Sequence, residues 1–238
     1  TLQYKNAGEP SLEHISFTVP RGSVVGIIGG TGSGKSSLVS LIPHFYDVKD
    51  GRVSVFGKNV CAYDDEDLRH RIGYVQQKAV LFQGTVRSNL LWGDDSASDD
   101  DLRTALSTAQ VLDILADKGG LDAPVEQNGA NFSGGQKQRL SVARALVRKP
   151  QILVLDDSSS ALDYATEAAM RKAILALPYK PTLFIVSQRA SSVMCADRIL
   201  VLEDGRLVGD GTHKALLANC PAYCEIYHSQ FSEEVTDA

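Results

Sequence analysis

A glycine-rich stretch, GGTGSGKSS at residues 29–37, has residue types that could hold a phosphate group. Its spacing fits G-x-x-x-x-G-K-[ST], with Lys35 and Ser36 at the polar positions. Glycines let consecutive backbone N–H groups point at phosphate oxygens, the lysine reaches the terminal phosphates, and the serine hydroxyl coordinates Mg²⁺. Similar turns also occur for packing alone, but here an apolar run precedes the loop and a helical pattern follows it. The predicted phosphate-binding residues are Gly29, Gly30, Thr31, Gly32, Ser33, Gly34, Lys35, Ser36 and Ser37.

A second stretch, ILVLD at residues 152–156, could supply a metal ligand. It reads as a buried strand that ends in Asp156, and ligands of open α/β sheets bind at the carboxyl ends of strands, where Mg²⁺ needs a carboxylate. Many strands end in aspartate, so this motif is weak alone. Together with the glycine-rich loop, it predicts a Mg²⁺ site that uses Asp156 and Ser36.

A third stretch, NFSGGQKQRLSVARALVRKP at residues 131–150, predicts a helix that begins after Ser133 and stops at Pro150. The free N–H groups of such a helix start could bind an anion. Because Ser133 is far from Lys35 in sequence, this anion need not be the one at the glycine-rich loop. The alternative is a capped helix with a basic, solvated face.

Short apolar runs separated by helical patterns predict how these motifs are positioned. The runs are VVGII (24–28), ILVL (152–155), LFIV (183–186) and ILVL (199–202), with a helical segment at about 164–177. They predict an α/β fold with a largely parallel sheet covered on both faces. After Ser98, an apolar stripe from Leu102 to Leu115 predicts one amphipathic helix that stops at Gly119. We expect the acidic tail after Phe231 to fray.

Composition limits the classes of partner. The net charge of −5 argues against nucleic acid, because proteins that bind phosphate backbones usually carry a basic excess. The sequence has no apolar run of about 18 residues that could span a bilayer and no signal peptide, so we expect the domain itself to lie in the cytosol. The spacing of the cysteines predicts reduced thiols rather than a metal site. These cysteines are Cys61, Cys195, Cys220 and Cys224.

The order of the motifs adds a resemblance to a known family. GGTGSGKSS, a strand that ends near Gln77, FSGGQ, ILVLD with SSSALD, and FIVSQR follow one another. This order resembles the nucleotide-binding domain of ATP-binding cassette (ABC) transporters over about residues 2–228. The resemblance implies a P-loop (RecA-like) ATP-binding core with a small antiparallel β subdomain and an α-helical subdomain. It implies one domain, 1–238, with the core at about 1–77 and 149–238 and the helical subdomain at about 78–148.

The same resemblance implies roles for single residues, with ATP and Mg²⁺ bound. Tyr4 resembles the aromatic residue that stacks on adenine, Gln77 the glutamine that senses γ-phosphate and Mg²⁺, and Asp163 the D-loop aspartate. The signature motif is matched by Ser133, Gly134, Gly135 and Gln136, with Phe132 where leucine is usual. By this resemblance, residues 29–37 match the Walker A loop. In this family two such domains pair head to tail, and each ATP lies between one domain's Walker loop and the partner's signature. VEQNG, residues 125–129, resembles the exporter segment that touches a coupling helix of the membrane domain, although a plain surface loop explains it equally well.

Two residues depart from the family pattern. Asp157 stands where the family has its catalytic glutamate, and Gln188 stands where it has the switch histidine. Aspartate is one methylene shorter, and a misplacement of about 1 Å can cost about 100-fold in rate. Glutamine can donate a hydrogen bond but carries no charge. These departures resemble the degenerate half of heterodimeric ABC exporters, and the alternative is tolerated variation in an active homodimer.

The expected partners are therefore a second nucleotide-binding domain, most simply a different chain, and a transmembrane domain reached through coupling helices. We expect the protein at the cytoplasmic face of the membrane within an integral membrane transporter. The start of the chain shortly before the strand-like Leu2 suggests a domain excised from a longer polypeptide. A superfamily ATPase that acts on nucleic acid is the less favoured alternative, because it should show a coiled-coil insertion or a basic excess.

Overall fold

The computed structural model describes residues 1–158 and 161–231. The tail that we expect to fray lies outside the described residues. The chain divides into two compact units, one of residues 1–69 and 183–238 and the other of residues 70–182. We refer to them as unit 1 and unit 2. The subdomain boundaries predicted near residues 78 and 148 do not coincide with the limits of these two units, and they stay a prediction.

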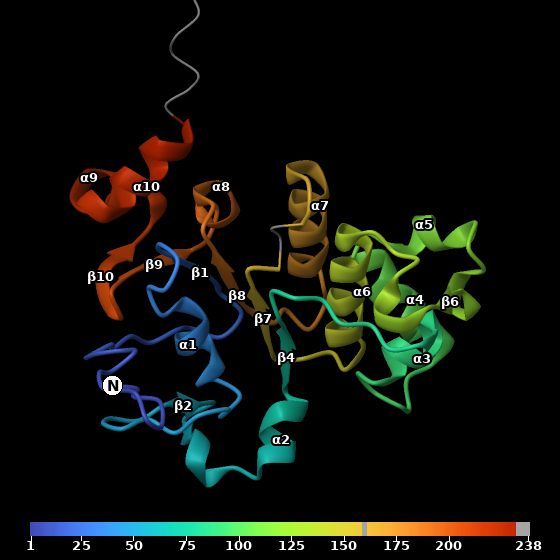
Figure 1. Ribbon diagram of the computed structural model, residues 1–238, viewed down its shortest axis with the longest axis horizontal. Coiled ribbons are helices and arrows are strands. Elements are labelled where there is room, and N and C mark those ends of the chain that lie inside the picture. The colour runs from blue at the N-terminus through green and yellow to red at the C-terminus, as the bar shows by residue number, and fades with distance from the viewer. Residues whose placement is uncertain (159–160, 232–238) are drawn as a thin grey trace, which may run out of the picture. The chain divides into compact units, whose positions relative to one another are not determined.

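Strands, α-helices and short 3₁₀ turns (η) alternate along the chain (Figure 1). The first part contains β1 (Val24–Ile28), α1 (Lys35–Ser40), β2 (Ser54–Val55), β3 (Lys58–Asn59), η1 (Val60–Ala62), α2 (Asp65–His70), β4 (Ile72–Val75), β5 (Gly84–Thr85) and α3 (Val86–Leu91). The middle contains α4 (Asp99–Thr108), α5 (Leu112–Ala116), η2 (Gly120–Asp122), β6 (Pro124–Val125), η3 (Gln127–Gly129) and α6 (Gly134–Val147). The last part contains β7 (Ile152–Asp156), α7 (Tyr164–Leu175), β8 (Thr182–Ser187), α8 (Ala190–Val193), β9 (Arg198–Glu203), β10 (Arg206–Gly211), α9 (His213–Asn219) and α10 (Pro221–Phe231).

The strands of unit 1 lie in the order β10-β9-β1-β8. Strand β1 pairs parallel to both β8 and β9, and β10 pairs antiparallel to β9. All five residues of β1 are buried, which explains why the run is apolar rather than alternating. Gly26 in this strand leaves room for α8, because a Cβ there would lie 2.6 Å from the Cβ of Val193. The predicted strands at 24–28, 183–186 and 199–202 are confirmed.

In unit 2, β7 pairs parallel to β4, and α6 packs against β4, α3 and α4 (Figure 1). All five residues of β7 are buried. The predicted helix after Ser133 is confirmed as α6, whose buried residues include Leu140, Ala143, Leu146 and Val147. The helix expected at about 164–177 is confirmed as α7.

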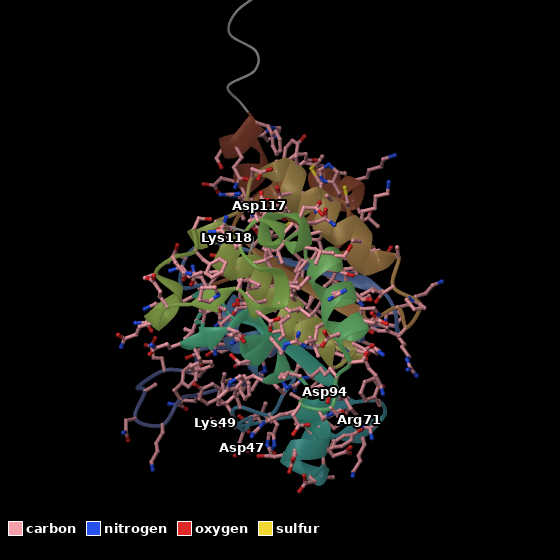
Figure 2. All side chains as sticks on the ribbon, turned by 90° about the vertical axis from the view of Figure 1, so that its right-hand side faces the viewer. Asp47, Lys49, Arg71, Asp94, Asp117 and Lys118 are labelled. Carbon is pink, nitrogen blue, oxygen red and sulfur yellow. The ribbon has the colours of Figure 1, made fainter. Side chains whose placement is uncertain are left out.

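The single helix predicted after Ser98 is wrong. The structure has two helices there, because the backbone turns at Gln110, which has a positive φ of 59°. Val111 continues the apolar stripe and is fully buried. The periodicity of apolar residues therefore runs across the point where the helix breaks and gives no sign of it. Helix α5 ends at Ala116 with Asp117 as its C-cap, and Lys118 then reaches over the ring of Phe132; Figure 2 labels Asp117 and Lys118.

Among the described residues, no helix combines the length and the apolar character that a bilayer crossing requires.

Candidate functional site

The glycine-rich loop of unit 1 joins the buried strand β1 to helix α1. The residue before the helix, Gly34, has a φ of 95°, a conformation that favours glycine. Gly29 is needed for close approach, because a Cβ there would lie 2.1 Å from the carbonyl oxygen of Leu202. Glycine at these two positions lets the chain wrap tightly between the sheet and the helix.

Lys35 is the first residue of α1, and its side chain folds back along the loop. Only 7% of the residue is exposed. Its ammonium donates to the carbonyl oxygens of Gly29 at 2.8 Å and Gly30 at 2.6 Å, and to the hydroxyl of Ser33 at 3.4 Å. The loop therefore holds a positive charge at its centre, which is the chemistry that a polyphosphate requires.

A cavity of about 320 Å³ opens beside this loop. It is lined by Pro10, Ser11, Gly32, Gly34, Lys35, Ser36, Ser37, Asp204 and Gly205. Tyr4 borders the same loop, since its hydroxyl donates to the Ser37 hydroxyl at 2.8 Å. The ring of Tyr4 meets Tyr46 edge-on with centroids 4.9 Å apart. The predicted adenine residue is thus anchored to the predicted phosphate loop, within unit 1.

Gln188 also contacts the loop within unit 1. The Thr31 hydroxyl donates to Oε1 of Gln188 at 3.3 Å. Gln188 follows β8, and its backbone carbonyl accepts a hydrogen bond of 2.8 Å from Gln230 of α10. The residue at the predicted switch position is therefore tied to the glycine-rich loop by one side-chain contact and to α10 through its backbone.

In unit 2, Asp156 ends the buried strand β7 and is 6% exposed. Its carboxylate accepts a hydrogen bond of 2.9 Å from the hydroxyl of Tyr74 at the end of β4. A buried carboxylate needs such polar partners or a cation. Sequence reasoning missed Tyr74, although its place near the carboxyl end of the neighbouring strand was a usable signal.

Asp157 follows and has a φ of 46°, which turns the chain sharply out of the strand. Its carboxylate accepts a hydrogen bond of 2.9 Å from the side-chain amide of Gln77. Sequence reasoning also missed Gln138 of α6, which is buried and donates to the backbone carbonyl of Gln76 at 3.1 Å. The structure therefore brings together, within unit 2, the predicted sensing glutamine and the carboxylate at the predicted catalytic position.

The predicted signature segment, residues 133–136, forms the capped start of α6. The Ser133 hydroxyl accepts from the N–H of Gln136 at 3.3 Å, and the Gln136 side chain accepts from the N–H of Ser133 at 3.0 Å. Gly135 allows a close approach to the next segment, since a Cβ there would lie 3.0 Å from the carbonyl oxygen of Ala161. The segment therefore presents a helix N-terminus made of small residues.

Asp163 caps the next helix, α7. It accepts hydrogen bonds from the N–H and the hydroxyl of Thr166 at 2.9 and 2.7 Å. The backbone hydrogen bond from Thr166 and the hydroxyl bond hold the pKa of Asp163 below its usual value. The residue predicted as the D-loop aspartate is thus an ionised helix cap at neutral pH.

A glycine-rich loop that surrounds a buried lysine, set between strand and helix on an α/β fold, defines the class of P-loop ATP-binding domains. The family described as ABC transporter matches residues 12–160. The chain belongs to this family and has the α/β fold of ABC ATPases.

Several known proteins are similar to the chain over nearly its whole length. It is 44% identical over its full length to an ABC transporter ATP-binding protein, YfiB, of Bacillus subtilis, of which it covers 41%. It is 39% identical over 98% of its length to an ATP-dependent lipid A-core flippase of Haemophilus ducreyi, of which it covers 40%. A solved structure of a bacterial Atm1-family ABC exporter with ATP bound has a TM-score of 0.93 and 36% identity; 98% of this chain and 41% of that chain are covered. The chain thus spans about two fifths of the length of these relatives.

Proposed function

We propose that this chain is the ATP-binding motor domain of an ABC exporter and that its own Walker site hydrolyses ATP slowly. The glycine-rich loop holds the phosphates through Lys35, and Tyr4 stacks on the adenine. The Mg²⁺ ligands predicted from the sequence are Ser36 in unit 1 and Asp156 and Gln77 in unit 2, and bound Mg²⁺ would neutralise charge on the phosphate oxygens. The charged centre of the loop and the buried carboxylate at the end of β7 both suit these ligands.

The main observation in support of a low turnover is the short carboxylate at position 157. Asp157 is bound to Gln77 at 2.9 Å, and its side chain ends one methylene before a glutamate would. Because a general base must sit within hydrogen-bond reach of the attacking water, a shortfall of about 1 Å lowers the rate by about 100-fold. Gln188, whose Oε1 accepts from Thr31, cannot supply the charge of a histidine at the switch position.

The intact signature motif fits a trans role. Two copies of this fold pair head to tail, so the capped helix start at Ser133 completes the site on the partner's Walker loop. The small residues Gly134 and Gly135 leave its N–H groups accessible to a γ-phosphate. The chain is therefore the half that holds nucleotide at its own site and supplies the signature to a competent one.

A membrane domain is the second partner, and unit 2 offers a surface for it. Phe82 and Trp92 stack with centroids 4.9 Å apart, yet they are 45% and 67% exposed. The Arg144 guanidinium lies 5.8 Å from the Phe82 centroid and donates to the Val80 carbonyl at 2.9 Å, so it packs against this pair and binds the adjoining backbone. A cavity of about 570 Å³ lies beside it, lined in part by Trp92 and by Asp94, which Figure 2 labels.

Exposed aromatic pairs of this kind mark interaction sites. The occupant is a coupling helix of the transporter's membrane domain, because about three fifths of each relative lies outside the part that this chain matches. The segment at residues 125–129, on the same unit, is the second candidate contact with that domain. The motor domain then works at the cytoplasmic face of the membrane.

The test reverses both departures in the assembled transporter. Asp157→Glu restores reach and Gln188→His restores a chargeable donor, so the double variant should hydrolyse ATP up to about 100-fold faster at this site than the parent. The two effects should be non-additive, because both act on one transition state. The partner's Walker lysine is replaced in all samples so that only this site contributes. A parent that already turns over as fast as the double variant would mean an active site, as in a homodimer.

A further inference from the structure

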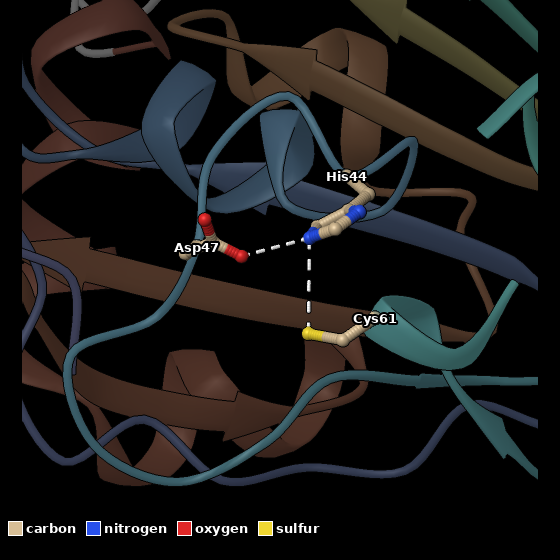
Figure 3. Close-up of side chains that lie close together, drawn as sticks. All are labelled: His44, Asp47 and Cys61. Carbon is tan, nitrogen blue, oxygen red and sulfur yellow. Dashed lines mark hydrogen bonds and ion pairs between the residues drawn. The ribbon is translucent and has the colours of Figure 1, made fainter. Parts of the chain in front are cut away.

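Three side chains that commonly bind metals gather in unit 1 outside the glycine-rich loop. Figure 3 shows His44, Asp47 and Cys61, with dashed lines from one imidazole nitrogen to the carboxylate and to the thiol. Nε2 of His44 lies 2.9 Å from Oδ1 of Asp47 and 3.7 Å from Sγ of Cys61. The three ligand atoms all lie within 4.8 Å of one another.

The backbone holds the histidine of this cluster in an uncommon conformation. His44 has a φ of 54°. Its N–H donates to the Leu41 carbonyl at 3.2 Å, and the next N–H, of Phe45, donates to the Ser40 carbonyl at 3.1 Å. This pattern closes a helical turn through a left-handed residue that is usually glycine. The Arg69 guanidinium donates to the His44 carbonyl at 3.2 Å, so the imidazole projects from a braced turn.

The other ring nitrogen of His44 also faces a carboxylate. Nδ1 lies 3.2 Å from Oδ1 of Asp65, and that carboxylate is itself paired with Arg69 at 2.9 Å. A neutral imidazole has one N–H and can donate to only one of two carboxylates. When Nδ1 donates to Asp65, the Nε2 lone pair faces an oxygen of Asp47 at 2.9 Å, and two such atoms repel unless a cation lies between them.

A proton is one such cation. The hydrogen bond to Asp47, together with that to Asp65, raises the pKa of His44 against the opposing effect of burial. A metal ion satisfies the same geometry, with a histidine that is oriented through its second nitrogen by a carboxylate, as metal-binding histidines usually are. The thiol on the open side of Nε2 distinguishes the two, because an ion-paired histidine has no need of it.

We propose that His44, Asp47 and Cys61 form a Zn²⁺ site, with Asp65 as the group that orients the imidazole. Nitrogen, oxygen and thiolate ligands together suit Zn²⁺ and do not suit Mg²⁺, which prefers oxygen. Zn²⁺ binds as Cys61 loses its thiol proton and Nε2 its shared proton, and both protons pass to solvent. Water occupies the fourth position.

Two of the three ligand separations are close to those that this metal requires. Tetrahedral Zn²⁺ with ordinary bond lengths places its nitrogen and oxygen ligands about 3.3 Å apart and its nitrogen and sulfur ligands about 3.6 Å apart. The corresponding separations are 2.9 and 3.7 Å. The oxygen and sulfur ligands, which the same geometry places about 3.6 Å apart, lie within 4.8 Å of each other. The Asp47 carboxylate must therefore swing toward Cys61 by up to about 1 Å, and its side chain is 83% exposed and able to do so.

The position of the site gives it a structural consequence. His44 follows the turn that ends α1, the helix that begins with Lys35, and Cys61 lies in η1. Bound Zn²⁺ would link these two segments and stabilise the folded state, since it binds the folded chain more tightly than the unfolded one. The spacing of the cysteines did not predict this metal site, because only Cys61 takes part and the histidine lies 17 residues away from it.

The test measures metal binding by the purified chain without a histidine tag. Competition with a chromophoric chelator should give one Zn²⁺ per chain. Cys61→Ser should weaken binding by at least about tenfold. With Co²⁺ in place of Zn²⁺, the parent should show a thiolate-to-cobalt charge-transfer band that Cys61→Ser lacks. Cys195→Ser removes another exposed thiol and should retain both properties.

Two more variants make the test specific to the cluster. Asp47→Asn should also weaken Zn²⁺ by at least about tenfold while the circular dichroism spectrum stays that of the parent. Added Zn²⁺ should raise the melting temperature of the parent and of Cys195→Ser but not of Cys61→Ser. The proposal is overturned if the parent binds no Zn²⁺, if Cys61→Ser binds it as tightly as the parent, or if the metal leaves with Cys220→Ser instead.

Discussion

Replacing Ser133 with arginine separates the two roles that this residue can have. Ser133 caps α6 through a reciprocal pair of hydrogen bonds with Gln136 at 3.3 and 3.0 Å. The head-to-tail proposal adds a contact with ATP on the partner's Walker loop. Ser133→Arg removes the cap and places a long charged side chain where the partner domain must approach.

The loss of the cap has a predictable size. Removing a serine N-cap costs about 1 kcal/mol, and in a domain of this length that lowers the melting temperature by about 2–4 °C. Ser98 provides the matched control, because it caps α4 with the same reciprocal pattern, at 3.2 Å in both directions with Asp101. Ser98→Arg should lose a similar amount of stability but contact no partner nucleotide. A difference in turnover between the two variants therefore reports the trans role.

The assay uses the transporter assembled with its second nucleotide-binding domain and with the substitution on this chain alone. ATP turnover and nucleotide occupancy of this chain's own loop are measured side by side. Ser133→Arg should abolish nearly all turnover while occupancy at Lys35 stays at the parent level. Ser98→Arg should leave both unchanged at a temperature well below its melting point.

Either of two results would refute the reasoning. If Ser133→Arg retains turnover, the competent site does not use this signature, and the roles of the two halves must be reversed. If Ser98→Arg loses as much turnover as Ser133→Arg, the loss reflects helix stability and not a contact with the partner's nucleotide.

Four further outcomes are expected. Lys35→Ala should weaken ATP binding measured by calorimetry by tenfold or more, because a charge-assisted contact with phosphate is lost, and Tyr4→Ala should weaken adenine nucleotides through lost stacking; unchanged affinity would exclude either role. Trp92→Ala should leave ATP binding by the isolated chain intact but reduce transport-coupled turnover in the assembled protein, and equal transport by variant and parent would rule out this docking surface. Gly26→Ala should destabilise the chain by about 1–3 kcal/mol in thermal unfolding, because its methyl group would overlap α8, whereas Gly8→Ala, with open space around it, should unfold like the parent.

The elements that position the site could be predicted from the sequence where their signals are local. The apolar run of β1, the glycines after it and the helical pattern that follows them from Leu38 lie close together in the sequence, and β1 and α1 form there. The cap at Ser133 and the stop at Pro150 likewise bracket α6. The break at Gln110 was not predictable, because the apolar stripe continues across it from α4 to α5 and only the backbone conformation changes there.

The sequence by itself determined which residues could do chemistry. The phosphate loop, the two adjacent aspartates and the departures at positions 157 and 188 can be recognised from residue type and local spacing alone. Tertiary structure decided which side chains meet. Gln77 reaches Asp157 across 80 residues, Thr31 reaches Gln188 across 157, and His44 reaches Cys61 across 17. The physical reason is that a hydrogen bond or a metal ligand set requires atoms within a few ångströms, and only the packing of strands and turns brings such distant positions together.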